Sequence, residues 1–150
     1  MSIDGYCLNQ LLPDVQQPFC RRESYSIEGG ADARVPLAMA MFGLATLPLI
    51  QRIKNANTTQ CWFADDAAAG ARLLCLRHWW DSLTKVGPKF GYFPNGIKTY
   101  LVTKPDKVDE ATELFSDTDV HVTCAGRRYL GGALGTEAFE QQFLEAKIWE

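Results

Sequence analysis

The sequence predicts a single α+β domain, in which an antiparallel sheet has helices packed on one face. The chain has 150 residues, of which 47% are hydrophobic and 11% aromatic, enough apolar material for one core. Segments with strand-like and helix-like periodicity alternate from residue 36 onward. Several strand-like segments follow one another closely, which indicates hairpins and therefore the α+β class.

Bulk composition excludes several classes of protein. No apolar run reaches the roughly 18 residues of a membrane span, and the longest, Val35–Ile50, is interrupted by Pro48. The chain opens without a basic segment followed by an apolar one, so we expect an intracellular protein of the cytoplasm or nucleus, not a secreted one. Five cysteines without C-x-x-C spacing predict free thiols. A net charge of −3 argues against strong stand-alone binding to nucleic acid.

The first half of the chain predicts a long helix and a hairpin. Pro36 suits a first helical position, and apolar residues then recur at helical spacing, so we expect a helix buried along most of its length. Thr58–Phe63 is rich in β-forming residues, and Ala67–Ala69 would pair with it. Residues 1–35 are left unassigned, apart from a short helix near Leu8–Leu12.

The second half alternates helices with short strands. The helical segments have apolar residues three or four positions apart, and the strands are rich in β-branched residues. The expected helices are Ala71–Val86, Pro105–Phe115 and Glu137–Trp149, and the expected strands are Ile97–Thr103, Val120–Thr123 and Tyr129–Gly131. The glycine-rich run Gly131–Gly135 lacks a following Lys-Ser or Lys-Thr, so we interpret it as a turn and not as a phosphate loop.

Asp65 and Asp66, at the tip of the predicted hairpin, are the first candidates for chemistry. Two adjacent carboxylates repel each other unless a cation lies between them. Mg²⁺ binds through one or two carboxylates together with substrate phosphates, and a pair of such ions assists phosphoryl displacement. The alternative is a solvated pair in which Asp66 caps the following helix. The dipeptide alone leaves both interpretations open.

Four blocks of sequence occur in an order and spacing more specific than any one of them. They are Pro36–Phe42, Trp62–Asp66, Gly91–Asn95 with Lys98-Thr99, and Arg127–Gly131. In these blocks the chain resembles the palm domain of reverse transcriptases, and those of non-LTR retroelements in particular. The resemblance spans about residues 28–135 and implies a partial polymerase palm in residues 36–150.

The resemblance also implies an activity, RNA-directed DNA synthesis by nucleotidyl transfer. Asp65 and Asp66 would bind Mg²⁺ or Mn²⁺. Lys98 would lie beside the triphosphate of the incoming nucleotide, where it would offset charge or donate a proton to the leaving pyrophosphate. The chemistry itself would depend on positioning and electrostatics.

Two further sets of residues receive roles from the resemblance. The nucleotide pocket would be bordered by Pro36, Phe63 and Ala64. The primer strand would be held by residues of the last block, namely Arg127, Arg128, Tyr129, Leu130 and Gly131. The implied partners are an RNA or DNA template-primer and a deoxynucleoside triphosphate.

The chain also departs from the family pattern, and these departures predict an inactive fragment. The family uses a further aspartate from an earlier strand, and Asp4, the early candidate, is too close to the helix for the usual layout. The family's Gln-Gly-x-Pro turn is replaced by Glu28–Pro36, and no thumb or fingers are matched. We therefore expect no polymerisation by this chain alone, and the metal ion is not necessarily bound. The alternative is a non-catalytic module that binds nucleic acid or protein.

Other polar and aromatic residues have plainer interpretations. His78 and His121 lack partners at metal-ligand spacing and are expected to be structural. Trp79 and Trp80 are expected in a core or interface rather than stacked on bases. The basic residues near the end either face a nucleic-acid backbone or form a solvated face, and they are Lys98, Lys104, Lys107, Arg127 and Arg128.

Overall fold

A mixed five-stranded sheet organises the molecule, with strand order β2-β3-β1-β4-β5. The computed structural model describes residues 3–9, 36–63 and 66–148. The strands are β1 Gly5–Asn9, β2 Thr58–Phe63, β3 Asp66–Ala71, β4 Thr99–Thr103 and β5 His121–Thr123. Neighbouring strands are antiparallel except β4 and β5, which are parallel. The predicted α+β class is confirmed.

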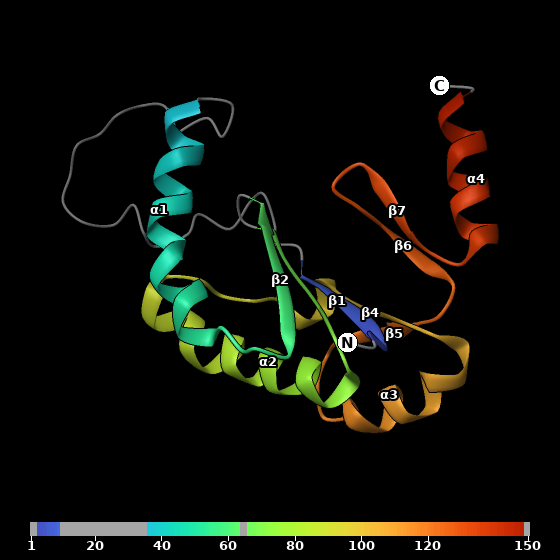
Figure 1. The fold of residues 1–150 in the computed structure, drawn as a ribbon, viewed down its shortest axis with the longest axis horizontal. Helices are drawn as coiled ribbons and strands as arrows, with labels where there is room; N and C mark the ends of the chain where they lie inside the picture. The colour runs from blue at the N-terminus through green and yellow to red at the C-terminus, as the bar shows by residue number, and fades with distance from the viewer. Residues whose placement is uncertain (1–2, 10–35, 64–65, 149–150) are drawn as a thin grey trace.

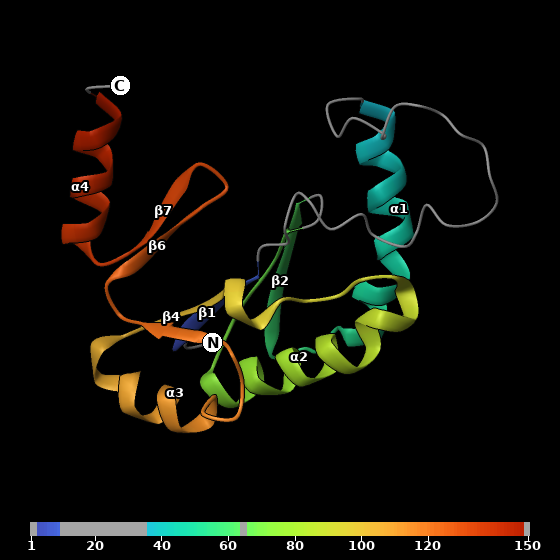
Figure 2. The same ribbon diagram turned by 180° about the vertical axis from the view of Figure 1, so that it is seen from behind.

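Two helices cover one face of this sheet, and a second hairpin with another helix lies on the opposite face. The helices are α1 Pro36–Ile53, α2 Leu73–Val86, α3 Val108–Leu114 and α4 Glu137–Ile148. Short 3-10 turns are η2 Gly87–Phe90, η3 Gly96–Lys98 and η4 Pro105–Lys107. The strands β6 Gly126–Tyr129 and β7 Gly132–Gly135 form a separate hairpin. Figures 1 and 2 show α2 and α3 below the sheet, with β6, β7 and α4 above it.

The main core lies between the sheet and α2. On the helix-facing side, β3 presents Ala67, Ala69 and Ala71, which are all buried. These small side chains leave room for large ones on α2, which buries leucines and both tryptophans: Leu73, Leu76, Trp79, Trp80 and Leu83. Burying one such leucine contributes about 1.5–3 kcal/mol. The expectation that Trp79 and Trp80 belong to a core is confirmed.

β1 is the central strand, and it corrects the prediction for the N-terminal segment. A short helix was expected near Leu8–Leu12, but Leu8 belongs to β1, and residues 10–12 lie outside the described residues. β1 pairs with β3 and with β4, so its hydrogen bonds come from distant parts of the chain. Cys7 in its middle is fully buried, and burial raises the pKa of its thiol to about 12.

The opposite face has a smaller cluster beneath the second hairpin. Leu8, Ala68 and Val102 are buried there, and Tyr129 and Leu134 of the hairpin pack against them. Leu8, Ala68 and Val102 alternate with the helix-facing residues of their strands, as the two-residue period of a strand requires. The sheet is therefore covered on both faces, although the hairpin covers only part of its own face.

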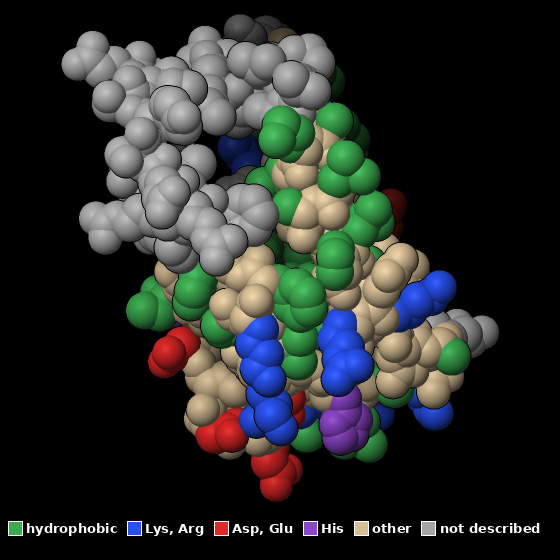
Figure 3. Space-filling view, turned by 90° about the vertical axis from the view of Figure 1, so that its left-hand side faces the viewer, with side chains coloured by type: hydrophobic (Ala, Val, Ile, Leu, Met, Phe, Trp, Pro, Cys, Tyr) green, Lys and Arg blue, Asp and Glu red, His purple; other side chains and the backbone are tan. Residues whose placement is uncertain are grey.

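The burial predicted for α1 is wrong for much of its length. Leu49 and Ile53 near its end are buried, but Met41, Leu44 and Leu47 are 62%, 68% and 45% exposed. The reason is geometric: the end of α1 packs on α2 and η2, while its earlier turns extend beyond the sheet (Figures 1 and 2). Figure 3 shows hydrophobic side chains gathered along this helix. Within the described residues, no helix has the length and apolarity needed to cross a membrane.

Several predicted boundaries moved. α2 begins at Leu73 because Ala71 still belongs to β3. β4 begins at Thr99, not Ile97, because the Asn95 side chain accepts a hydrogen bond from the Lys98 N–H (3.3 Å) and holds residues 96–98 in a 3-10 turn. The glycine-rich run interpreted as a turn is mostly β7, and the strand expected at Tyr129–Gly131 ends at Tyr129.

α2 and α3 are joined through one arginine. The Arg77 guanidinium donates to both carboxylate oxygens of Asp117, to Asp81 (2.9 Å) and to the Leu114 carbonyl (2.6 Å). It also lies 5.7 Å from the centre of the Phe115 ring. The guanidinium lowers the pKa of Asp117, and Asp117 in turn raises the pKa of Arg77.

Candidate functional site

The first candidate hairpin, β2–β3, presents Asp66 at one end of the sheet. Phe63 pairs with Asp66, and the two residues between them, Ala64 and Asp65, lie outside the described residues. Asp66 is half-buried and Phe63 is exposed. The neighbouring Ala67 is fully buried against the core, which fixes the backbone that positions Asp66.

The interpretation of Asp66 as a helix cap is wrong. α2 begins only at Leu73, and its N-cap position is Arg72. Asp66 is instead the first residue of β3. Its side chain therefore belongs to the hairpin end and is not used to start the helix.

Lys98 lies at the same end of the sheet as Asp66. β3 and β4 both run antiparallel to the central β1, and Asn9 of β1 pairs with Ala67 on one side and Thr99 on the other. Asp66 and Lys98 each come one residue before these partners. Asp66 is the first residue of β3, whereas Lys98 ends the 3-10 turn η3 directly before β4. The sheet therefore places two residues that are far apart in the sequence at the same end of neighbouring parts of the fold.

Asp4, the early candidate for a further carboxylate, lies at the opposite end of β1. Its N–H donates to the Ala71 carbonyl (3.1 Å), at the far end of β3 from Asp66. Six residues of strand separate it from the level of Asp66, which is roughly 20 Å.

The fit of a divalent cation depends on which oxygens are available. Among the described residues, Asp66 contributes one carboxylate at the hairpin end, and no group of three or more His, Cys, Asp or Glu side chains lies together. Mg²⁺ commonly takes one or two protein carboxylates and completes its shell with water and phosphate. Asp66 would thus supply one ligand of such a site and not the whole of it.

The second candidate hairpin, β6–β7, turns through two residues with positive φ. Leu130 has φ 49° and Gly131 has φ 79°, the sign that a type I′ hairpin turn requires at both central positions. Leu130 is exposed at this turn, while the Tyr129 ring packs inward on the sheet. The residues predicted to contact the primer therefore divide into the exposed turn and the partly buried Tyr129.

The two arginines of β6 stack on aromatic rings. The Arg127 guanidinium lies 3.9 Å from the centre of the Tyr100 ring, and Tyr100 stacks on His121 (5.1 Å). Arg128 lies 5.1 Å from the centre of the Phe143 ring of α4. Such contacts hold a guanidinium by its face and leave its N–H edge available. His121 thus has an aromatic partner that the sequence did not indicate, while His78 is exposed.

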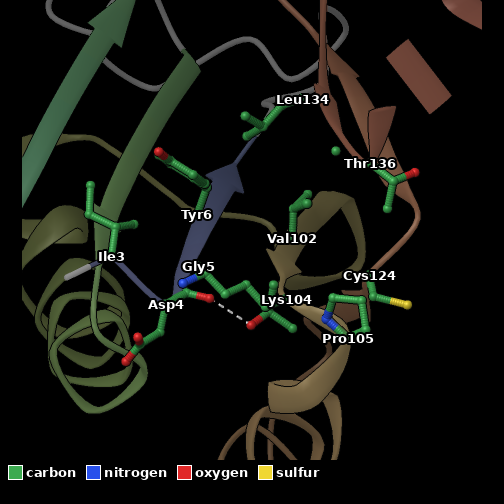
Figure 4. Close-up of a pocket in the computed structure, with 12 residues that line it drawn as sticks. Ile3, Asp4, Gly5, Tyr6, Val102, Lys104, Pro105, Cys124, Leu134 and Thr136 are labelled. Carbon is green, nitrogen blue, oxygen red and sulfur yellow. Dashed lines mark hydrogen bonds between the residues drawn. The ribbon is translucent and has the colours of Figure 1, made fainter. Parts of the chain in front are cut away.

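Two hollows border the β6–β7 hairpin. One, of about 510 Å³, lies between the hairpin and α4 and is bordered by Arg127, Arg128 and Lys147. The other, of about 290 Å³, lies at the foot of the hairpin beside β1 and β4. Figure 4 shows Tyr6, Val102 and Leu134 around this second hollow, with the Asp4 carboxylate pointing away from it.

The predicted nucleotide pocket stays a prediction. Phe63 is exposed at the end of β2, whereas Ala64 and the side chain of Pro36 lie outside what the structure describes. Sequence reasoning missed Tyr100, whose ring lies against the Arg127 guanidinium. Tyr100 follows Lys98-Thr99 in an alternating strand and had been assigned to that strand without a contact.

Comparison with known proteins adds no relative. No family model, no curated protein and no solved structure matches this chain.

Proposed function

We propose that this chain is part of the palm of a retroelement reverse transcriptase, an RNA-directed DNA polymerase that works by nucleotidyl transfer. The observation that supports this proposal most is that Asp66, the first residue of β3, and Lys98, directly before β4, lie at the same end of the sheet. Phosphoryl transfer needs a carboxylate end for a cation and a positive group for the departing phosphates.

In this proposal each group has one task. Mg²⁺ or Mn²⁺ held by Asp65 and Asp66 would lower the barrier to attack on the α-phosphate of a deoxynucleoside triphosphate. Lys98 would offset charge on the β- and γ-phosphates. The N–H edges of Arg127 and Arg128 would contact the backbone of an RNA or DNA primer-template. The parent enzyme would act in the cytoplasm or nucleus.

We further propose that the chain does not extend primers by itself. Among the described residues, no group of three or more His, Cys, Asp or Glu side chains lies together to complete a metal site around Asp66. Asp4 is displaced to the other end of the strand.

A binding assay tests the proposal without requiring turnover. Fluorescence anisotropy of a labelled RNA–DNA primer-template should show binding that weakens steeply with salt. The double variant Arg127→Met and Arg128→Met should reduce that salt dependence by about two phosphate contacts. The matched control is Lys85→Met with Lys89→Met, two exposed cations on the opposite side of the sheet. Absence of binding at low salt would remove the nucleic-acid role.

The alternative is a module that binds protein, and the exposed apolar residues of α1 favour it. Primer extension with Mg²⁺ or Mn²⁺ separates the catalytic claims. We expect no incorporation by the wild-type chain. Incorporation that is lost on Asp66→Asn would contradict the inactivity while assigning the activity to this site.

A further inference from the structure

The outer edge of β2 has backbone groups that point outward and that another strand could use for pairing. β2 is an end strand, and among the described residues it pairs with β3 alone. The Thr58 N–H donates to the Asn55 carbonyl (3.2 Å) and so points away from β3. Because these groups alternate along a strand, the N–H and C=O groups of Gln60 and Trp62 also point outward.

This edge lacks the usual protection against strand pairing. Natural edge strands are blunted by short length, charged side chains, proline or a bulge. The opposite edge, β5, has only three residues. β2 has six residues, none of them charged and none proline. The two edges of the sheet therefore differ, and among the described residues β2 is the edge strand to which another strand could pair.

We propose that β2 pairs antiparallel with β2 of a second copy of this chain, centred on Cys61. A two-fold axis perpendicular to the sheet leaves each side chain on the same face of the combined sheet. Odd-numbered residues of one β2 must therefore pair with odd-numbered residues of the other, and even with even. Pairing Gln60 with Trp62 of the second copy uses only the outward-pointing groups. A register centred on Gln60 would require the Thr58 N–H as a donor to the second copy, but this N–H already donates to the Asn55 carbonyl.

The side chains suit a second copy. In this register Cys61 faces Cys61, and Thr59 faces Phe63 of the other chain, an aromatic–β-branched pair of the kind that stabilises sheets. Thr59, Cys61 and Phe63 are all exposed in the single chain. The edge is neutral, so two copies meet without repulsion between like charges.

α1 supplies additional apolar surface on the same side. In Figures 1 and 2 it stands on the β2 side of the molecule, where Met41, Leu44 and Leu47 are exposed. A strand pair alone is small compared with the roughly 1,200 Å² or more of stable interfaces. We therefore expect a reversible dimer whose population depends on concentration. The dimer does not depend on nucleotidyl transfer.

Sedimentation equilibrium over a concentration series of the full chain, under reducing conditions, tests the proposal. The wild-type chain should approach dimer mass as concentration rises. Cys61→Lys places two like charges opposite each other and should weaken the dimer at least tenfold. The matched control is His121→Lys, at an exposed position of the other edge strand, which should dimerise as the wild type does. Both variants should retain a cooperative thermal transition.

Cross-linking tests the register. Facing residues at a non-hydrogen-bonded position have Cα atoms about 4.5 Å apart, within disulfide range. Diamide should link two chains through Cys61, as mapped by peptide mass spectrometry, and Cys61→Ser should abolish this link. A monomer at every concentration, a dimer indifferent to Cys61→Lys, or a cross-link through another cysteine would each overturn the proposal.

Discussion

The two hairpins are built from the same kind of unit but are held in opposite ways. β2–β3 has six residue pairs and its alanines are buried against the tryptophans and leucines of α2. β6–β7 has four pairs and contacts the sheet through the partly buried Tyr129 and Leu134 and through the Arg127 guanidinium on the Tyr100 ring. Local stability follows buried apolar contact, so the acidic hairpin end should be rigid and the basic hairpin should open more readily.

The β6–β7 hairpin joins the rest of the chain at a narrow neck formed by Ala125, Gly126, Gly135 and Thr136. A Cβ on Gly135 would lie 2.4 Å from the Gly126 Cα and 2.5 Å from the Ala125 carbonyl oxygen. The Thr136 N–H donates to the same carbonyl (2.9 Å), and the Thr136 hydroxyl oxygen accepts from the Phe139 N–H at the start of α4 (3.3 Å). The backbone connection from the sheet to the basic hairpin and α4 thus passes through a place where only glycine fits at position 135.

The largest effect should come from the support behind β2–β3. Leu76→Ala removes a fully buried side chain and should lower the free energy of unfolding by about 2–5 kcal/mol, as measured by urea denaturation. Leu74→Ala, on the same helix but 61% exposed, should change it by less than about 0.5 kcal/mol. Equal effects would mean that α2 does not anchor the hairpin as described.

A smaller, local effect should follow Gly135→Ala. The added methyl group must displace the neck, at a cost of about 1–3 kcal/mol. Hydrogen exchange should speed up in β6, β7 and α4 and stay slow in β2 and β3. Gly132→Ala is the control, because its nearest contact is the Tyr129 carbonyl oxygen at 3.5 Å and it should be tolerated. Faster exchange in β3 would show that the hairpins are not independent.

The buried Cys7 should make stability fall at high pH. Its folded pKa is raised from 9.0 to about 12, so the folded chain keeps a proton that the unfolded chain loses above pH 9.0. Stability should therefore decline by about 1.4 kcal/mol per pH unit between these values. Cys7→Val should flatten this part of the curve, and an unchanged slope would contradict the burial of Cys7 in β1.

The smallest effect concerns the link between α2 and α3. The pKa of Asp117 is lowered by Arg77, so its stabilisation is present above the ordinary carboxylate pKa and is lost as pH falls through the lowered one. Because Asp117 is exposed, the effect on the melting temperature should be small. Asp117→Asn should lower the melting temperature slightly at neutral pH and should remove the further decrease that the wild type shows in acid. Asp109→Asn serves as an exposed acidic control.

The elements visible to sequence reasoning are those with local signals. α1 and β2 were predicted with the right starts because proline, helical spacing and β-branched residues act over neighbouring positions. β1 was missed because its pairing partners are Ala67–Ala71 and Thr99–Thr103, which no local pattern reveals. The turn at Leu130 was missed because leucine has no preference for positive φ.

The candidate site divides in the same way. Asp66 and the hairpin that presents it follow from residues adjacent in sequence. The position of Asp66 and Lys98 at the same end of the sheet requires the strand order of the sheet. The exposure of α1 also depends on where the helix ends up relative to the sheet, and its composition alone indicated burial.

The central place of β1 has a consequence for how the chain reaches its fold. The ribosome makes β1 before both of its neighbours, yet Gly5 must pair with Ala71 and with Thr103. β2–β3 and α2 can assemble locally and quickly, whereas closing the long loops that seat β1 is slow. During synthesis β1 can therefore pair fully only after β4 has been made, and the sheet is completed when β1 inserts between β3 and β4.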